Sequence, residues 1–406
     1  MRIRPFAAVR PPVDLAARVA SLPYDVGDLD TARAEAQANP MSFLHVERPE
    51  VDLPDAFDAA AGLHHQTAAA NLRRFLQQGV LQQDAEPALY VYQQTLGAHQ
   101  QTGVLATCHI DDYYADVIKK HEKTKKPTED DRTRHVLTVG AQTGPIFLLH
   151  RDQPAVDRLV AAAKQGAPLY DFTAADGIRH TVWRVAASPP LVAAFASIPV
   201  AYVADGHHRA AAASRAGVER RQANPNHTGQ EEYNWFLAVL FPAHQLQVLA
   251  YNRMLRDLNG LEPAAFLAEV RRRFPVTEEA PPRPVAPGSV SMYLGGRWYS
   301  LKTEAPAGAD PVAALDVSIL QDRLLAPVLG IADPRNNSRI EYLGGFRSVE
   351  ELQQRVDNGQ AVVGFSVHPT TVDQLMAISD AGQIMPPKST WFEPKLRSGL
   401  FVHRLD

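Results

Sequence analysis

The chain has 406 residues, 45% of them hydrophobic, which favours two or three globular domains and excludes global disorder. The 41 Lys and Arg residues are outnumbered by 45 Asp and Glu residues, and the net charge of −4 argues against a dedicated nucleic-acid binder. No apolar run predicts a membrane span or a signal peptide, so we expect a cytoplasmic protein with no membrane partner. The single cysteine, Cys108, indicates a buried strand thiol rather than a nucleophile.

The first part of the chain alternates predicted helices and strands. Residues 28–40 form a helix with an acidic start and a stop at Asn39-Pro40, and residues 41–50 form a strand. The alanine-rich stretch 56–80 is a longer helix closed by Gly79. Residues 88–112 are typical of a β-hairpin that turns between Gly97 and Gly103.

The middle of the chain is predicted to form a strand, a tight turn and a helix. Residues 198–218, IPVAYVADGHHRAAAASRAGV, carry this pattern, and Gly217 is the predicted helix stop. Residues 236–242 and 246–255 follow as a second pair of strands.

The last third begins with a predicted helix over 261–274. Residues 281–289, PPRPVAPGS, are too rich in proline for a helix or a central strand and form a connector, which a hairpin over 291–301 follows. Residues 360–395 give a strand, a helix and a stiff loop. The whole is an α+β fold with mixed sheets. We expect a first domain over 1–250 and a C-terminal α/β domain over 251–406.

Residues 205–209, DGHHR, carry the most specific chemical signal. A strand that ends in Asp-Gly and opens into a helix places backbone N–H groups and the positive end of the helix dipole together, which favours phosphate. Gly206 allows close approach, and Arg209 supplies a forked donor. His207 and His208 can donate to phosphate or orient a neighbour, and Asp205 is a candidate Mg²⁺ ligand. Alternatively, Asp205 caps the helix and the histidines are ordinary surface groups.

A second cluster surrounds His121 and Glu122. The zinc-protease pattern HExxH fails here because Lys125 stands where the second histidine would be. What remains is one carboxylate among lysines, which could serve as a general base in surroundings that attract phosphate. The other interpretation is a mobile, solvated charged loop. Further along, the prolines of GQIMPPKST stiffen a loop that presents Lys388, Ser389 and Thr390, either to an anionic substrate or as a plain surface turn.

Several other polar residues give weaker signals, and each is more often structural. They are Asp25 in LPYDV, His45, Glu47 and Arg48 in HVER, Arg134 and His135, and the TGP turn at 143–145.

Over most of its length the chain resembles the uncharacterised DUF1015 family. DGHHR resembles the phosphate-binding box of the ParB/sulfiredoxin superfamily, and most closely that of archaeal free-serine kinases. Those kinases carry a Lys-Pro-His-Glu segment, which Lys120, His121 and Glu122 match apart from the proline. They also end in a Pro-Lys-Thr/Ser-Thr step that resembles residues 387–390.

The resemblance implies a ParB-like mixed-sheet catalytic portion whose site a smaller C-terminal α/β portion completes. It also implies roles for individual residues. Glu122 would be the catalytic base, assisted by His121 and Asp205. Residues 205–209 would cradle the nucleotide phosphates and Mg²⁺, and Lys388, Ser389 and Thr390 would bind substrate. The implied reaction is phosphorylation of free L-serine to O-phosphoserine with ATP or ADP as donor, a step of serine metabolism.

The chain also departs from those kinases. More than 100 residues precede its KHE segment, and Trp391-Phe392 stands where the kinases have Arg-His. His207 occupies the place of the reactive cysteine of sulfiredoxin, which excludes that chemistry, and no basic helix-turn-helix predicts DNA binding. The alternative function is a non-catalytic nucleotide-binding regulator. The oligomeric state is left open.

Overall fold

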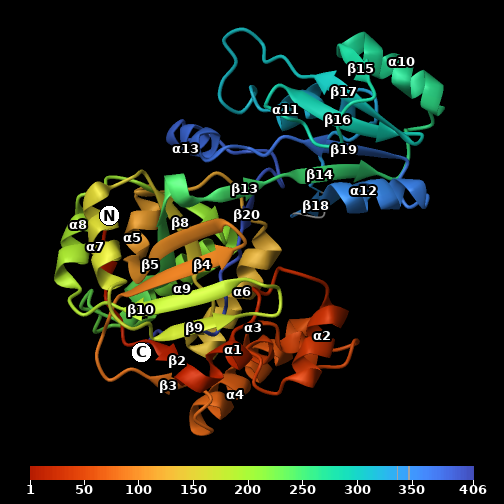
Figure 1. The fold of residues 1–406 in the computed structure, drawn as a ribbon. Helices are drawn as coiled ribbons and strands as arrows, with labels where there is room; N and C mark the ends of the chain where they lie inside the picture. The colour runs from red at the N-terminus through yellow and green to blue at the C-terminus, as the bar shows by residue number, and fades with distance from the viewer. Residues whose placement is uncertain (336, 346–347) are drawn as a thin grey trace. The chain divides into compact units, whose positions relative to one another are not determined.

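The computed structural model describes residues 1–335, 337–345 and 348–406 (Figure 1). The chain forms two compact units. The first comprises Met1–Leu246 together with Pro394–Asp406, and the second comprises Gln247–Glu393. The first unit therefore contains the last 13 residues of the chain, because the C-terminal segment returns to it. The predicted functional division at residue 250 stays a prediction.

A nine-stranded sheet organises the first unit, in the order β6-β11-β8-β12-β5-β4-β10-β9 with β1 beside β5. Its strands are β1 Ile3–Arg4, β4 Tyr90–Leu96, β5 His99–His109, β6 Ile118–Lys119, β8 Ile146–His150, β9 Tyr170–Thr173, β10 Arg179–Arg184, β11 Ala201–Asp205 and β12 Trp235–Pro242. Two small sheets pair β2 Val9–Arg10 with β3 Gln82–Gln83, and β7 Ala141–Gln142 with β21 His403–Arg404.

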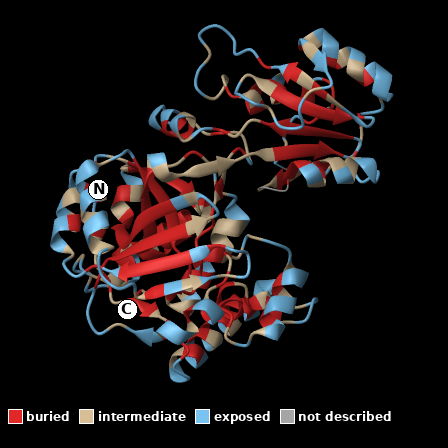
Figure 2. Ribbon diagram, viewed as in Figure 1, coloured by how far each residue is buried: buried red, intermediate tan, exposed pale blue. Residues whose placement is uncertain are grey.

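The large sheet is mixed, as predicted. β11 runs parallel to β6 and β12 parallel to β8, whereas the other pairs are antiparallel. The middle strands β8 and β12 are apolar and buried, which is expected for strands covered on both faces (Figure 2). The predicted hairpin is β4 with β5. Its turn is at Gly97, while Gly103 lies inside β5, where a Cβ would come within 2.7 Å of Val239.

Helices lie around these sheets. They are α1 Ala16–Val19, α2 Leu29–Ala38, α3 Leu44–Glu47, α4 Leu63–Gln77, α5 Ile110–Tyr114, α6 Lys126–Val139, α7 Pro154–Ala163, α8 Pro189–Ala196 and α9 His207–Ala223. The helix predicted over 28–40 is α2, capped by Asp28. The strand predicted over 41–50 is wrong, because this segment forms α3 and a 3-10 turn. All four residues of α3 are buried, and a short, wholly buried helix has no amphipathic pattern to distinguish it from a strand.

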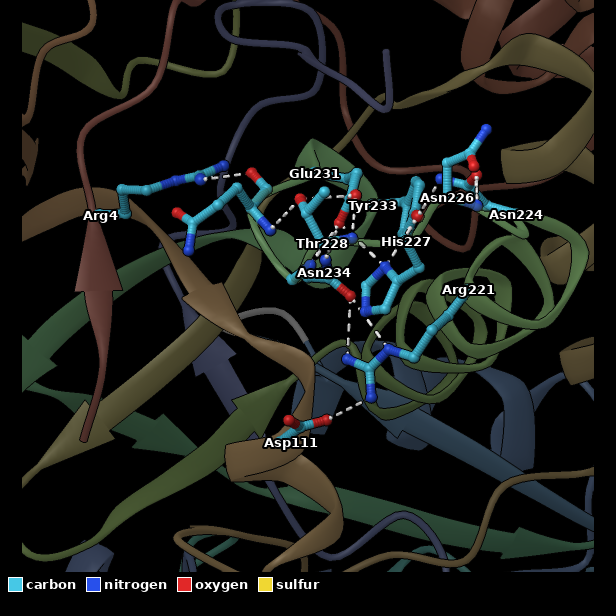
Figure 3. A network of polar contacts seen from close by, with 12 residues as sticks. Arg4, Asp111, Arg221, Asn224, Asn226, His227, Thr228, Glu231, Tyr233 and Asn234 are labelled. Carbon is cyan, nitrogen blue, oxygen red and sulfur yellow. Dashed lines mark hydrogen bonds and ion pairs between the residues drawn. The ribbon is translucent and has the colours of Figure 1, made fainter.

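Helix α9 is longer than predicted. Gly217 does not end it but lies in its interior, where a Cβ would meet the carbonyl oxygen of Tyr233 at 2.3 Å. Polar contacts hold the C-terminal end of α9 (Figure 3). Arg221 donates to Asp111 at 3.1 Å and, through Nη2, to Asn234 at 2.9 Å. This end of the helix is therefore fixed to two neighbouring segments.

The second unit contains a six-stranded sheet in the order β15-β17-β16-β19-β14-β18. Its strands are β14 Tyr251–Leu255, β15 Val276–Glu278, β16 Ser289–Leu294, β17 Arg297–Lys302, β18 Ile340–Gly344 and β19 Val363–Val367, and β13 Gln247–Leu249 pairs with β20 Trp391–Glu393. Its helices are α10 Pro263–Arg273, α11 Asp316–Leu320, α12 Ser348–Asp357 and α13 Val372–Asp380. The predicted helix 261–274, the hairpin 291–301 and the strand and helix within 360–395 are confirmed.

Across the described part of the chain, no helix has both the length and the apolar character that a membrane crossing requires.

Candidate phosphate-binding site

The turn between β11 and α9 allows the side chain of Arg209 to come close to the backbone at Gly206. The pairing of β11 with β8 shifts register between Val203 and Asp205, a bulge that changes the direction of the strand's last side chain. Gly206 then adopts φ +89°, a left-handed conformation that favours glycine, and α9 begins at the next residue. A Cβ on Gly206 would lie 3.0 Å from Nε of Arg209. Glycine therefore allows the guanidinium to fold back over the turn.

Two cationic side chains hold Asp205. Nη2 of Arg209 donates to Oδ2 at 2.8 Å, and Nζ of Lys395 donates to Oδ1 at 3.0 Å. Nη1 of Arg209 also donates to the carbonyl oxygen of Pro145 at 2.6 Å. Burial opposes ionisation of Asp205, but Lys395 and Arg209 outweigh it and hold the carboxyl pKa below its usual value. The group is thus ionised and two positive charges lie beside the start of α9.

Two buried nitrogens at this helix end have no hydrogen-bond partner among the described residues. They are Nε of Arg209, which is a donor, and Nε2 of His207, which donates in one tautomer of the neutral ring. Unsatisfied buried polar atoms are rare in folded proteins, since each costs about 1–3 kcal/mol. A helix N-terminus also attracts anions through its N–H groups and its dipole. An anion bound here would find the Nε–H of Arg209 and the positive charges of Arg209 and Lys395.

Glu122 lies at the same place. Its Oε2 is 3.8 Å from Nδ1 of His207, and its side chain is 41% exposed and so accessible to a substrate. Burial, followed by the neighbouring His121, lowers the pKa of His207 well below its usual value. His207 is therefore neutral at pH 7.

His121 lies behind His207. The two rings pack edge to face with centroids 4.4 Å apart, and burial lowers the pKa of His121 to about 4. His208 accepts a hydrogen bond from the backbone N–H of Lys125 at 3.0 Å. Residues 121–125 are thus held against the first turn of α9 at two points, His207 and His208. The structure brings together seven of the predicted site residues, listed as His121, Glu122, Asp205, Gly206, His207, His208 and Arg209.

A buried polar wall continues from Arg209. Glu47 is fully buried, accepts a hydrogen bond from Thr143 and lies 3.5 Å from Nη2 of Arg132. A Cβ on Gly144 would come within 3.4 Å of Glu47 and 3.7 Å of Arg209, so the three residues are adjacent. Arg132 also lies over the ring of Tyr24 at 4.2 Å. Of the weak sequence signals, Glu47 and the turn at 143–145 therefore lie on this wall, and Tyr24 of LPYDV lies beside it. His45 does not, because it pairs with Asp52 at 2.8 Å.

The sequence analysis did not single out Lys395 or Arg132. Lys395 is only 8% exposed in a chain where most lysines are solvated, yet nothing local in WFEPK marks it. Its role depends on a partner far away in the chain.

The three predicted substrate-binding residues lie in the second unit. Lys388 is exposed with φ +55°, and its Nζ is 5.3 Å from the ring centroid of Tyr251. The hydroxyl of Ser389 donates to the carbonyl oxygen of Pro386 at 2.7 Å, so it closes its own loop. The assignment of Lys388, Ser389 and Thr390 to substrate stays a prediction.

Asp205 suits Mg²⁺ poorly as the sole protein ligand. Mg²⁺ takes oxygen ligands and is usually held by one or two carboxylates with phosphates and water. Both oxygens of Asp205 already accept hydrogen bonds from cations, which would repel a second positive ion. Among the described residues, the only group of three or more candidate ligands lies elsewhere, at His64, His65 and Asp131. No step proposed below depends on the ion.

Comparisons with known proteins give one family. A family model described as "Protein of unknown function (DUF1015)" matches residues 3–318. No curated protein matches the chain. Solved structures that resemble it include a free serine kinase in complex with AMP (12% identity, TM-score 0.38, covering 74% of this chain and 91% of that one). They also include SbnI with a C-terminal truncation from Staphylococcus aureus (12%, 0.40, 73% and 86%) and a conserved hypothetical protein from Pyrococcus furiosus (12%, 0.37, 74% and 94%).

Proposed function

The chain belongs to the DUF1015 family, and we propose that it is a nucleotide-dependent kinase that phosphorylates the hydroxyl of a small molecule, free L-serine. One observation carries the proposal. The exposed carboxylate of Glu122 reaches the N-terminus of α9, where an ionised Asp205 holds Arg209 and Lys395. The residue proposed as general base thus lies beside the helix end proposed to bind phosphate, although 83 residues separate Glu122 from Asp205 in the sequence.

Each group has a task in phosphoryl transfer. The N-terminus of α9, with Arg209 and His207, binds the phosphates of ATP or ADP and stabilises the charge that develops during transfer. Lys395 adds a positive charge, and Asp205 orients both cations. Glu122 accepts the proton of the attacking serine hydroxyl as its oxygen bonds to phosphorus and the bond to the leaving nucleotide breaks. His121 packs against His207 and positions it. Mg²⁺ would arrive with the nucleotide, bound mainly by phosphate and water oxygens.

The test is a product assay. Purified chain is incubated with L-serine, Mg²⁺ and either ATP or ADP, and O-phosphoserine is measured by mass spectrometry beside the variants Glu122→Gln and Glu219→Gln. Glu219 lies on α9, where it pairs with Arg215 at 3.1 Å, and serves as the control. We expect product from the parent and the control, and turnover reduced about 100-fold or more in Glu122→Gln.

Nucleotide binding separates the outcomes. If Glu122→Gln keeps full turnover, Glu122 is not the base. If the parent binds nucleotide, measured calorimetrically, yet forms no phosphorylated product with serine or other hydroxylated small molecules, the kinase proposal is wrong and the chain is a nucleotide-binding regulator. If it binds no nucleotide, both functions are wrong.

A further inference from the structure

The structure contains a second cluster of ionisable side chains that the proposed kinase does not use. His64 and His65 lie in the first turn of α4, and Asp131 lies on α6. Both imidazoles are buried, with 5% and 3% exposure, while Asp131 is half-exposed. Each Nε2 lies 3.0 Å from Oδ1 of Asp131.

The convergence of both rings on a single oxygen is informative. Successive residues of a helix point about 100° apart, so neighbouring histidines normally diverge. Here the ring centroids of His64 and His65 are only 3.8 Å apart, because Asp131 draws both rings toward Oδ1. One carboxylate oxygen can accept two hydrogen bonds. The same convergence also brings two imidazole nitrogens and a carboxylate oxygen around one point, which is the arrangement that a bound ion requires.

The spacing fits the ligands of a metal ion. Zn²⁺ binds imidazole nitrogen and carboxylate oxygen at roughly 2.0–2.2 Å, which places neighbouring ligand atoms about 2.8–3.6 Å apart in octahedral or tetrahedral geometry. Both nitrogen–oxygen distances are 3.0 Å, and the candidate ligand atoms all lie within 4.8 Å of one another. The half-exposed Asp131 leaves one side open to water ligands.

We propose that His64, His65 and Asp131 bind a divalent transition-metal ion of the Zn²⁺ class. Two imidazoles with one carboxylate suit zinc, cobalt or iron(II) rather than Mg²⁺ or Ca²⁺, which prefer oxygen ligands throughout. The ion links α4 to α6, the helix that carries Arg132 of the polar wall beside Arg209. The ion therefore stabilises the packing of α4 against α6 within the first unit. This role is independent of the proposed phosphoryl transfer.

The experiment uses full-length chain without a histidine tag, freed of metal by a chelator. Co²⁺ is titrated and its visible absorption followed, and Zn²⁺ is then added as competitor. We expect one strongly bound ion per chain, displaced by Zn²⁺, and a rise in melting temperature with Zn²⁺. The variants His65→Gln and Asp131→Asn should each bind at least about 10-fold more weakly. His244→Gln is the matched control, because His244 pairs with Asp152 at 2.8 Å without a third ligand.

Absence of Co²⁺ binding by the parent, or equal affinity in His65→Gln and the control, would overturn the proposal. Should either variant fail to fold without metal, X-ray absorption of the Zn²⁺-loaded parent decides. Two imidazole nitrogens with oxygen around the ion would support the site, whereas sulfur or no imidazole would refute it. Loss of kinase activity alone decides nothing here, since the readout is metal binding.

Discussion

Nζ of Lys395 lies 3.0 Å from Oδ1 of Asp205, although 190 residues separate the two in the chain. The C-terminal segment therefore contributes a buried positive charge to the turn between β11 and α9. Because Arg209 occupies the other oxygen of Asp205, one carboxylate holds two cations at the helix end. Asp205, Arg209 and Lys395 together carry a net charge of +1, which favours an anionic ligand.

Replacing Lys395 with methionine tests this contribution. The variant keeps the length of the side chain but removes its charge, so the phosphate loses one cation and Asp205 loses one partner. We expect the Kd for ATP or ADP, measured by calorimetry, to rise about 10-fold, or roughly 1.4 kcal/mol. The control is Lys302→Met, because Lys302 is exposed and pairs with Glu304 in the second unit. Equal affinity in both variants would remove Lys395 from the site.

Arg209 should not tolerate lysine. Its fork donates to Asp205 at 2.8 Å and to Pro145 at 2.6 Å while a third nitrogen has no partner, and one ammonium cannot reproduce that geometry. We expect Arg209→Lys to weaken nucleotide binding about 10-fold or more. Arg215→Lys on the same helix, whose charge pairs with Asp130 at 2.5 Å on the surface, should stay within twofold of the parent. Equal effects of the two variants would contradict a specific role for Arg209.

Local sequence signals predicted the parts of the fold that depend on local chemistry. Helix α2 has the acidic start and the end at Asn39 that were expected, and the strand, turn and helix around Gly206 follow from Asp-Gly before an alanine-rich run. The DUF1015 resemblance and the mixed α+β fold are confirmed. Segment 41–50 was predicted as a strand because its short helix is buried on all sides and shows no amphipathic pattern. Gly217 was predicted to end α9, but a glycine is needed there because the backbone of Tyr233 leaves no room for a Cβ. Lys395 and Arg132 were not predicted, because their partners Asp205 and Glu47 lie far from them in the sequence.

The buried imidazole of His121 should make stability depend on pH. Burial lowers its pKa to about 4 in the folded chain, against an ordinary value of 6.5. Between these pH values the unfolded chain binds more protons than the folded chain. The contribution of the buried, neutral His121 to stability is therefore complete above about pH 6.5 and is lost as the pH falls toward 4.

His121→Gln removes this titration while keeping a neutral polar side chain. Between pH 7.5 and pH 5.0, urea unfolding should show the parent losing about 2 kcal/mol more than the variant. Buried histidines that do not contact His121 titrate alike in both proteins and cancel in the difference. His207 does not cancel fully, because His121 also lowers its pKa, and this contribution adds to the larger loss in the parent. Equal losses would mean that His121 is not buried as a neutral imidazole.

Gly217→Ala separates helix propensity from packing. Alanine is favoured over glycine inside a helix by about 1 kcal/mol. The new Cβ would nevertheless lie 2.3 Å from the carbonyl oxygen of Tyr233 and 2.8 Å from Cδ1 of Ile110, and backbone cannot yield as a flexible side chain can. We expect a net loss of roughly 1–3 kcal/mol in the free energy of unfolding, measured with urea. At Gly166, where nothing lies within 4 Å of the added Cβ, alanine should change stability by less than about 0.5 kcal/mol. A stabilised Gly217→Ala would show that α9 does not pack against the Tyr233 segment as described.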